Sequence, residues 1–292
     1  KASFIYAAET VQGIARQLGN YQTLTGDPLF VEKFLSDVDQ VSVDDIKNML
    51  QKYMIGQNKT IVALLPKRVS NPHKFQLENG LTMLVNKNQA SPSFAFMIGF
   101  VGGLKEEPQG KNGIFNALSK MLLRGTKDKS ANAIAKEIDM LAGNMDAFNG
   151  KNIFGLSGKF LSKDIKKVLG LLKEVLTSTV FREEELKTVK GEILSEIRQR
   201  DDDPIRNTFI RFNETLYKGH PYSRDPVGNE ADIENLKLND IEEYYKNYVS
   251  PSNAVLAISG DVDEKELKAM FENLFFQWKG RSNPLKKLPP VA

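Results

Sequence analysis

The fold of this chain is decided by residues 111–126, Lys-Asn-Gly-Ile-Phe-Asn-Ala-Leu-Ser-Lys-Met-Leu-Leu-Arg-Gly-Thr. Apolar residues recur in it at the spacings typical of one face of a helix, and they are Ile114, Phe115, Leu118, Met121 and Leu122. Gly113 stands where such a helix would begin, and Gly125 indicates where it ends. Because Asn116 and Lys120 are four residues apart, their side chains leave the same side of the helix one turn apart.

These two positions have a chemical meaning. In one class of zinc peptidases an i, i+4 pair of histidines binds the metal, and a glutamate between them acts as general base. The stretch resembles the inverted zinc-binding helix, H-x-x-E-H, of the M16 peptidases, the family of the insulin-degrading enzymes, pitrilysin and the mitochondrial processing peptidases. The resemblance is carried by a frame of four residues, Gly113, Met121, Gly125 and Thr126. It places Asn116, Ser119 and Lys120 where the family has His, Glu and His.

The resemblance therefore implies a motif whose chemistry is gone. An amide and a hydroxyl are poor zinc ligands, and the ammonium of Lys120 would repel a dication. The family's third ligand aligns with Glu196, 76 residues after Lys120, and one carboxylate does not hold zinc. We predict no metal site and no catalytic residue here, with Asn116, Lys120 and Glu196 lining a substrate chamber. The alternatives are a solvated helix face at 116–120 and an ordinary exposed glutamate at 196. We also expect Lys120 and Glu196 to lie close together across two packed helices.

The composition excludes several classes of function. The chain has 292 residues, of which 41% are hydrophobic and 26% charged, as in an ordinary soluble globular protein. Its 40 Lys and Arg nearly balance 37 Asp and Glu, which gives no basis for binding nucleic acid. Without cysteine there is no disulfide or thiolate, and with two histidines a multi-histidine metal site is excluded. No apolar run is long enough for a membrane span. Cytoplasm and periplasm remain equally compatible.

Two segments of the chain resemble each other. Residues 39–62 echo residues 234–257 at a constant offset, which pairs Ile46 with Ile241, Tyr53 with Tyr248 and Asn58 with Asn253. Two copies of a helix followed by a strand suggest tandem homologous domains of which the first is truncated, and the alternative is a chance likeness. Together with the resemblance this predicts four parts: the C-terminal part of a preceding M16-type domain (1–66), a linker (67–72), an M16-type domain lacking the zinc motif (73–280) and a Lys/Pro-rich linker or tail (281–292).

Local signals predict the individual elements. An Asn79-Gly80 turn predicts a hairpin within residues 75–85. Further strands are predicted at 60–65, 94–101, 144–150, 152–160 and 254–259. Asp27 is the expected cap of a helix that begins at Pro28, and Asp203-Pro204 should end one helix and begin another that carries Phe209, Phe212 and Leu216. The resemblance implies an α+β fold, the M16-type (LuxS/MPP-like) layer of mostly antiparallel sheet with helices packed on one face.

Other polar residues receive simpler interpretations. The ring of His220, in a His-Pro-Tyr loop, is expected to bond to backbone, and His73 to be exposed. Arg198 and Arg200 could meet a peptide, but charges at a helix end are usually solvated. The triplet 201–203 lacks the glycine and distal glutamate of a calcium loop.

The resemblance also implies a function for a longer protein, of which this chain looks like an internal piece. M16 proteins pair a zinc-bearing half with a silent half, in one chain or as two subunits, and the halves close around an unfolded peptide. In the zinc-bearing half a metal-activated water attacks the peptide carbonyl, with the motif glutamate as base. We expect this chain to supply the non-catalytic half of a zinc metalloendopeptidase, without a cofactor of its own. The alternatives are a non-peptidase scaffold homologue and an isolated peptide-binding module.

Overall fold

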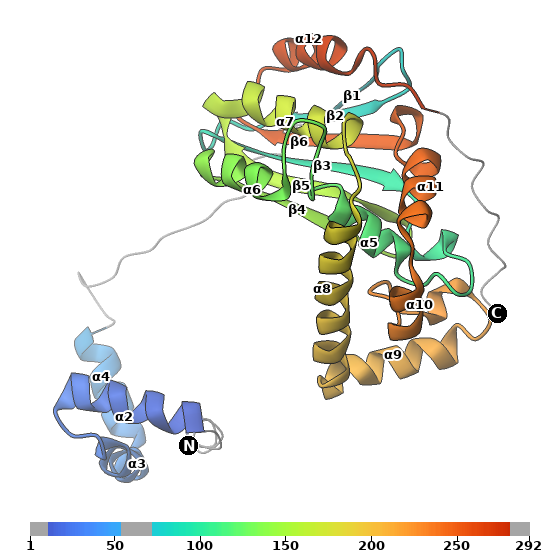
Figure 1. Cartoon of the computed structure of the whole chain (residues 1–292). Helices are drawn as coiled ribbons and strands as arrows, with labels where there is room; N and C mark the ends of the chain where they lie inside the picture. Colours follow the sequence, from blue (N-terminus) through green and yellow to red (C-terminus); the bar gives the residue numbers. More distant parts are fainter. Residues whose placement is uncertain (1–10, 54–71, 281–292) are drawn as a thin grey trace. The chain divides into compact units, whose positions relative to one another are not determined.

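A computed structural model describes residues 11–53 and 72–280 of the chain (Figure 1). The chain divides into two compact units, residues 1–68 and 69–292, which we take one at a time. Within the described residues no helix is both long and apolar enough to cross a membrane. The strand predicted at 60–65 and most of the linker predicted at 67–72 lie outside the described residues.

In the smaller unit, the described residues 11–53 form three helices, α2 (Val11–Thr25), α3 (Phe30–Gln40) and α4 (Val43–Tyr53). None of them contains a buried residue. The predicted start of α3 is wrong: Asp27 Oδ1 accepts a hydrogen bond from the Leu29 N–H (2.9 Å), which closes a turn before the helix, and Leu29 takes the cap position. Apolar residues of α2 and α4, such as Val11, Ile46 and Met49, are exposed, although amphipathic helices normally bury such residues. Phe30 of α3 is partly buried and packs on Tyr21 of α2, with 5.5 Å between the ring centroids.

The helical half of the predicted repeat is present in the structure. Helix α4 and helix α11 (Leu238–Tyr248) each have 11 residues, and both begin and end at equivalent positions of the repeat. In both, an aspartate of the first turn accepts the N–H of the cap residue: Ser42 N to Asp45 Oδ2 at 2.9 Å, and Lys237 N to Asp240 Oδ2 at 3.0 Å. Their environments differ, because Ile46 is 52% exposed while the equivalent Ile241 is fully buried.

In the larger unit, the described residues 72–280 form a six-stranded sheet in the order β1-β2-β6-β3-β5-β4. Its strands are β1 (His73–Gln76), β2 (Thr82–Lys87), β3 (Ser93–Val101), β4 (Asn144–Asn149), β5 (Ile153–Leu161) and β6 (Ala254–Gly260). Only β2 and β6 pair in parallel, and the other neighbours are antiparallel. The predicted Asn79-Gly80 turn is confirmed, since it joins antiparallel β1 and β2 and Gly80 adopts the left-handed conformation (φ +93°).

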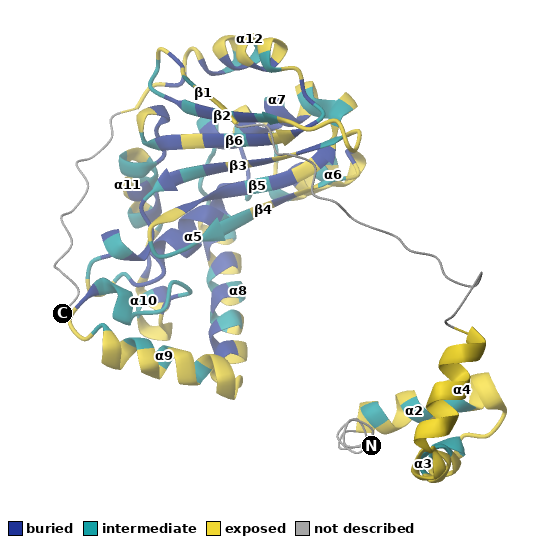
Figure 2. Ribbon diagram, turned by 180° about the vertical axis from the view of Figure 1, so that it is seen from behind, coloured by how far each residue is buried: buried dark blue, intermediate teal, exposed yellow. Residues whose placement is uncertain are grey.

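Helices cover one face of this sheet. They are α5 (Ile114–Met121), α6 (Ala131–Met140), α7 (Ile165–Thr177), α8 (Glu183–Asp201), α9 (Pro204–Leu216), α10 (Glu230–Asn235), α11 and α12 (Glu264–Phe275). In Figure 2, which views the larger unit from behind, none of its described helices covers the opposite face of the sheet. Strand β3 alternates accordingly: Phe94, Phe96 and Ile98 are buried, while Met97 between them is 46% exposed. The predicted α+β layer of mostly antiparallel sheet with helices on one face is confirmed.

Helix α5 lies at the centre of the larger unit, where it contacts the sheet, α8 and α11. The ring of Phe115 packs on Phe154 of β5 (4.8 Å between centroids) and meets the edges of Tyr244 and Tyr248 of α11 (5.3 and 4.9 Å). Apart from Lys120, every residue of α5 is buried. Aromatic pairs of this kind add about 0.5–1.5 kcal/mol each beyond the area they bury. These contacts fix the position from which α5 presents its polar side chains.

Candidate functional site

The N-terminus of α5 is set by a glycine. Gly113 has a φ of +97°, which L side chains rarely adopt. A Cβ at this position would meet the Ile233 side chain at 2.7 Å, Gly228 Cα at 2.9 Å and the Val227 carbonyl oxygen at 2.9 Å. Two of these three atoms are backbone and cannot move aside cheaply. The close approach of two chain segments therefore requires the glycine that the sequence placed at the start of the helix.

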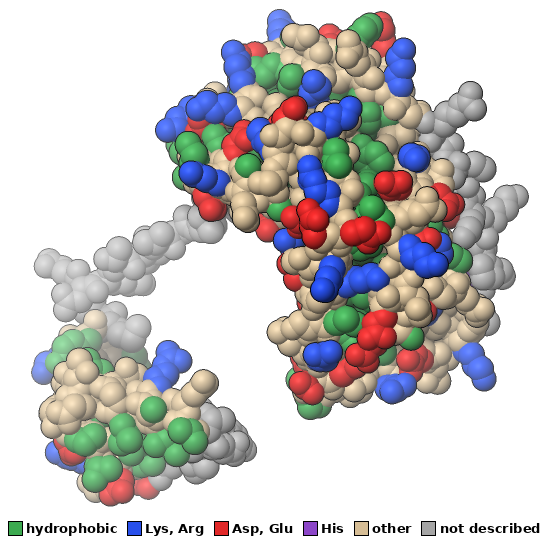
Figure 3. Space-filling model, in the orientation of Figure 1, with side chains coloured by type: hydrophobic (Ala, Val, Ile, Leu, Met, Phe, Trp, Pro, Cys, Tyr) green, Lys and Arg blue, Asp and Glu red, His purple; other side chains and the backbone are tan. Residues whose placement is uncertain are grey.

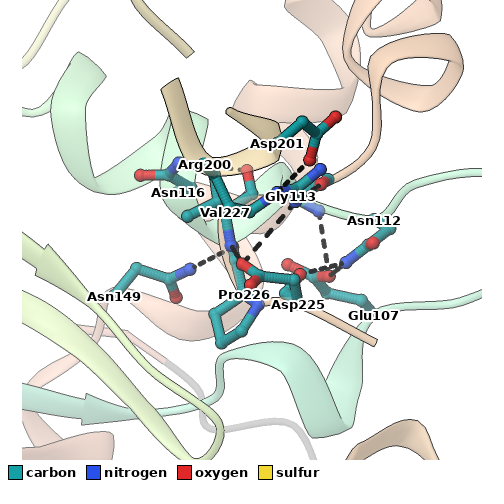
Figure 4. Close-up of polar contacts among 11 residues, drawn as sticks. Glu107, Asn112, Gly113, Asn116, Asn149, Arg200, Asp201, Asp225, Pro226 and Val227 are labelled. Carbon is teal, nitrogen blue, oxygen red and sulfur yellow. Dashed lines mark hydrogen bonds and ion pairs between the residues drawn. The ribbon is translucent and has the colours of Figure 1, made fainter. Parts of the chain in front are cut away.

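A buried carboxylate caps the same helix end (Figure 4). Glu107 accepts hydrogen bonds from the side-chain amide of Asn112 (2.8 Å), from Gly113 N (2.9 Å) and from Phe115 N (3.3 Å). A negative group at this end complements the helix dipole and satisfies backbone N–H groups that have no partner within the helix. Burial raises the pKa of Glu107 above its ordinary value, while these hydrogen bonds oppose that shift.

The loop between α9 and α10 is held against α5 through its carbonyl groups. The side-chain amides of Asn112, Asn116 and Asn149 donate to the carbonyl oxygens of residues 225, 227 and 226, at 3.1, 3.1 and 2.9 Å (Figure 4). Arg200 Nη1 donates to the Gly228 carbonyl at 2.9 Å. A loop rich in proline and glycine, whose regular structure is one short 3-10 helix (Pro221–Ser223), is thereby fixed against α5.

Sequence reasoning missed most of this network. The sequence around Glu107 is polar and suggests a solvated loop. Arg224 lies far along the chain, in the loop after α9, and donates to the Glu107 carbonyl at 2.8 Å. The prediction that Arg200 belongs to a solvated helix end is wrong: the residue is 9% exposed and holds both Gly228 and Asp201. The signal for Arg200 was its spacing, because it follows Ile193 and Ile197 on the buried face of α8.

The predicted contact between α5 and α8 is confirmed. Lys120 Nζ lies 2.8 Å from Glu196 Oε1, with 23% of the lysine and 41% of the glutamate side chain exposed. Three residues after α5 ends, Arg124 forms a second ion pair with α8, at Glu192. The spacing of 76 residues that related position 120 to Glu196 therefore reflects a real proximity in space.

The other two motif positions, Asn116 and Ser119, are buried. Ser119 is 1% exposed and donates to the Asn116 carbonyl at 2.9 Å, and Asn116 is 8% exposed with its amide bonded to the Val227 carbonyl. The alternative of a solvated helix face is therefore wrong for these two residues. That Asn116, Lys120 and Glu196 line a chamber stays a prediction.

The end of the motif is anchored independently. Thr126 Oγ1 donates to Glu174 Oε1 at 2.6 Å, and Lys129 Nζ contacts both Glu174 (2.7 Å) and Glu137 (2.6 Å). Although burial raises it, the contacts with Lys129 and Thr126 hold the pKa of Glu174 below its ordinary value. Gly125 and Thr126 thus keep a structural task after α5 ends.

The histidines match their simpler interpretations. His220 is buried and its Nδ1 accepts the Tyr222 N–H at 3.2 Å, which confirms a structural role. His73 is exposed, and its ring lies 3.0 Å from a carboxylate oxygen of Glu264. Neither histidine belongs to a group of three or more His, Cys, Asp or Glu side chains suited to a metal, and the described residues contain no such group.

The residues at the motif do not fit a zinc ion. Structural and catalytic zinc sites take three or four ligands from Cys, His, Asp or Glu. Here the only such side chain is Glu196, and its oxygen is bonded to an ammonium. The Asn116 amide is bonded to a carbonyl, and the Ser119 hydroxyl faces its own helix.

The face of the larger unit that carries the helices shows acidic and basic side chains interspersed (Figure 3).

Comparison with protein-family models supports the resemblance that Gly113, Met121, Gly125 and Thr126 indicate. The family model described as insulinase (peptidase family M16) matches residues 82–229, just over half of the chain. The chain belongs to the M16 peptidase family. A second model of the family, described as the peptidase M16 inactive domain, matches residues 235–292.

Individual M16 proteins show the extent of the likeness. An uncharacterized zinc protease of Rickettsia bellii is 29% identical over 201 residues, which cover 68% of this chain and 48% of that protein. Subunit 1 of the mitochondrial cytochrome b-c1 complex of Bos taurus is 22% identical over 200 residues, 68% of this chain and 42% of that subunit. The crystal structure of a protease from Helicobacter pylori, 27% identical, superposes with a TM-score of 0.68 over 78% of this chain and 54% of that one. The chain spans about half the length of the curated relatives it matches.

Proposed function

We propose that this chain is an internal part of an M16 zinc metalloendopeptidase and supplies the non-catalytic half of its peptide-binding chamber. One observation carries the proposal: at the positions of the family's metal ligands, Lys120 supplies a positive charge that is bonded to Glu196 at 2.8 Å. The charge that a metal would bring is supplied by the protein itself. This half shapes the chamber, and the zinc and the catalytic water belong to the other half, in the same chain or in a partner subunit.

The uncovered face of the sheet supports a role in holding peptide. It presents small and apolar side chains across neighbouring strands, among them Leu84, Met97, Val255 and Ala257, and a hollow of about 530 Å³ lies over its centre. A sheet face of this character offers contact area to an unfolded polypeptide without selecting one sequence. We assign it to the wall of the chamber.

We further propose that residues 1–66 end a preceding M16-type domain and that residues 73–280 form the next one. The support is the likeness of α4 and α11 in length and capping, together with their opposite burial. Residues of α4 such as Ile46 then pack in the longer protein as Ile241 does here. In that protein the backbone amides of α4 should exchange with solvent more slowly than in this chain, and equal rates would contradict the assignment.

The cytochrome b-c1 likeness favours a second candidate, a scaffold homologue that binds no peptide. The two candidates differ in one property, which is affinity for unfolded polypeptide. An isolated peptide-binding module, without a catalytic partner, would bind such a polypeptide in the same way, but no zinc-bearing half would associate with it.

A binding and cleavage assay tests the proposal. Fluorescein-labelled, reduced and carboxymethylated α-lactalbumin is titrated with the purified chain, and anisotropy and fragmentation are followed together. We expect binding without cleavage, and weaker binding for Met97→Glu on the open sheet face. Met140→Glu is the matched control, because Met140 is exposed on α6, on the helix-covered side. An absence of binding would favour the scaffold, and chelator-sensitive cleavage by this chain alone would refute the proposal.

A further inference from the structure

Helix α9 carries an apolar stripe that faces solvent. Ile205, Phe209, Phe212 and Leu216 are 73, 64, 57 and 51% exposed, and no residue of the helix is buried. Figure 2 shows α9 as a mostly exposed element at the far end of α8, away from the sheet. An amphipathic helix of a folded domain normally turns such a stripe toward the core. The side of α9 that is turned toward the rest of the unit carries Asn207, Ile210 and Asn213, which are partly buried.

The stripe has the spacing of a helix-pairing seam. Its four residues are separated by 4, 3 and 4 positions, which is the alternation of the a and d positions of a heptad. The pattern also reads the same in both directions. When two copies run antiparallel, Ile205 of each faces Leu216 of the other, and Phe209 faces Phe212. A surface that is complementary to itself is what a two-fold interface requires.

The charges at the ends of the helix fit the same arrangement. Asp203 precedes the helix and Lys218 follows it, and antiparallel pairing brings each beside the other. The positions that flank the seam are Arg206 and Asn213 on one side and Thr208 and Thr215 on the other. No like charges face each other across the pair, so nothing in the flanks opposes association.

We propose that α9 is an interaction surface for a second copy of this chain, paired antiparallel through Ile205, Phe209, Phe212 and Leu216. Burying the exposed parts of these side chains on both copies removes on the order of 1,000 Å² from water, the lower limit for a specific interface. The dimer is therefore weak, with a dissociation constant of roughly 10–100 μM. The inference does not depend on the proposed function.

Sedimentation velocity of the full chain from 2 to about 500 μM tests the association. We expect a monomer–dimer equilibrium in the wild-type chain and a monomer throughout for Phe209→Asp/Phe212→Asp, a loss of more than 10-fold in affinity. Phe276→Asp is the matched control, because Phe276 is 70% exposed at the end of α12, on the opposite side of the larger unit (Figure 1). A wild-type chain that stays monomeric overturns the proposal, and so does a dimer that survives the double substitution. A monomer whose α9 variants lose binding to a zinc-bearing half assigns the stripe to that half and likewise overturns it.

Disulfide trapping tests the register. The chain has no cysteine, so a bond between introduced cysteines is unambiguous. A mixture of Ile205→Cys and Leu216→Cys chains should form a disulfide-linked heterodimer on mild oxidation. Either variant alone should not, because in this register two copies of one position lie about 16 Å apart along the helices, beyond the reach of a disulfide. Efficient linking of position 205 to itself, or no linking in the mixture, contradicts the antiparallel pair.

Discussion

The two ends of α5 are held in different ways. At the N-terminus, Gly113 is in backbone contact with Gly228, and the buried Glu107 satisfies the first N–H groups of the helix. At the C-terminus, Lys120 is the last residue but one of α5, and it forms an ion pair with Glu196 that is partly open to water. The features that shape the helix depend on buried backbone, whereas the partly exposed pair Lys120–Glu196, at two positions that would hold a metal, contributes little to folding. The frame of a zinc helix can therefore persist after its ligands are replaced.

The largest effect is expected at Gly113. Substitution by alanine forces a side chain into a left-handed backbone position and onto two backbone atoms less than 3 Å away. We expect Gly113→Ala to lower the free energy of unfolding by about 3 kcal/mol or more, measured by urea denaturation.

Gly110→Ala is the matched control for this substitution. Gly110 also has a positive φ (+81°), but an added Cβ would meet nothing within 4 Å, so only the backbone strain of about 1 kcal/mol applies. Equal losses for the two variants would show that the contact with Gly228 does not hold α5 in place.

An intermediate effect is expected at Glu107. Glu107→Gln replaces an acceptor of three hydrogen bonds with an amide that cannot accept them all, which should cost about 1–3 kcal/mol at neutral pH.

The stability difference between the wild-type chain and Glu107→Gln should change with pH in a definite direction. Because burial raises the pKa of Glu107, the folded chain keeps, between pH 4.5 and its own higher pKa, a proton that the unfolded chain has lost. The stability that this proton contributes is fully present below the unfolded pKa, ordinarily 4.5, and is lost as the pH rises through the folded pKa. The advantage of the wild-type chain over Glu107→Gln should therefore shrink as the pH rises from 4.5, and an advantage that grows would contradict the raised pKa.

The smallest effect is expected at Lys120 and Glu196. A double-mutant cycle with alanine should give a coupling energy of about 0.2–1 kcal/mol that falls further at high salt, because both side chains are partly exposed. The pair Arg124–Glu192 has similar exposure one turn away and should give a similar value. A coupling above about 3 kcal/mol would mean that the pair is buried and that the two ends of α5 are not different.

The sequence predicted what depends on local spacing. The period of apolar residues located α5, and the resemblance to the M16 motif, which aligns Glu196 with the family's third ligand, predicted the contact between Lys120 and Glu196. It did not predict the cap of α5, because Glu107 becomes buried only when the loop after α9 folds over it. The environment of Arg200 was missed for the same reason. Phe209 and Phe212 were recognised as helical, but spacing alone does not say which face of α9 meets solvent.

The most direct test of the account restores the ligands. The variant Asn116→His/Ser119→Glu/Lys120→His places two imidazoles and a carboxylate on the existing frame, with Glu196 as third ligand. Each chain is dialysed against a zinc buffer, and its zinc content is measured by inductively coupled plasma mass spectrometry. We expect about one zinc per chain in the triple variant, none in the wild-type chain, and none in the triple variant that also carries Glu196→Ala. A folded triple variant without zinc, or a wild-type chain that retains stoichiometric zinc, would contradict the claim that α5 is a zinc helix with its ligands replaced.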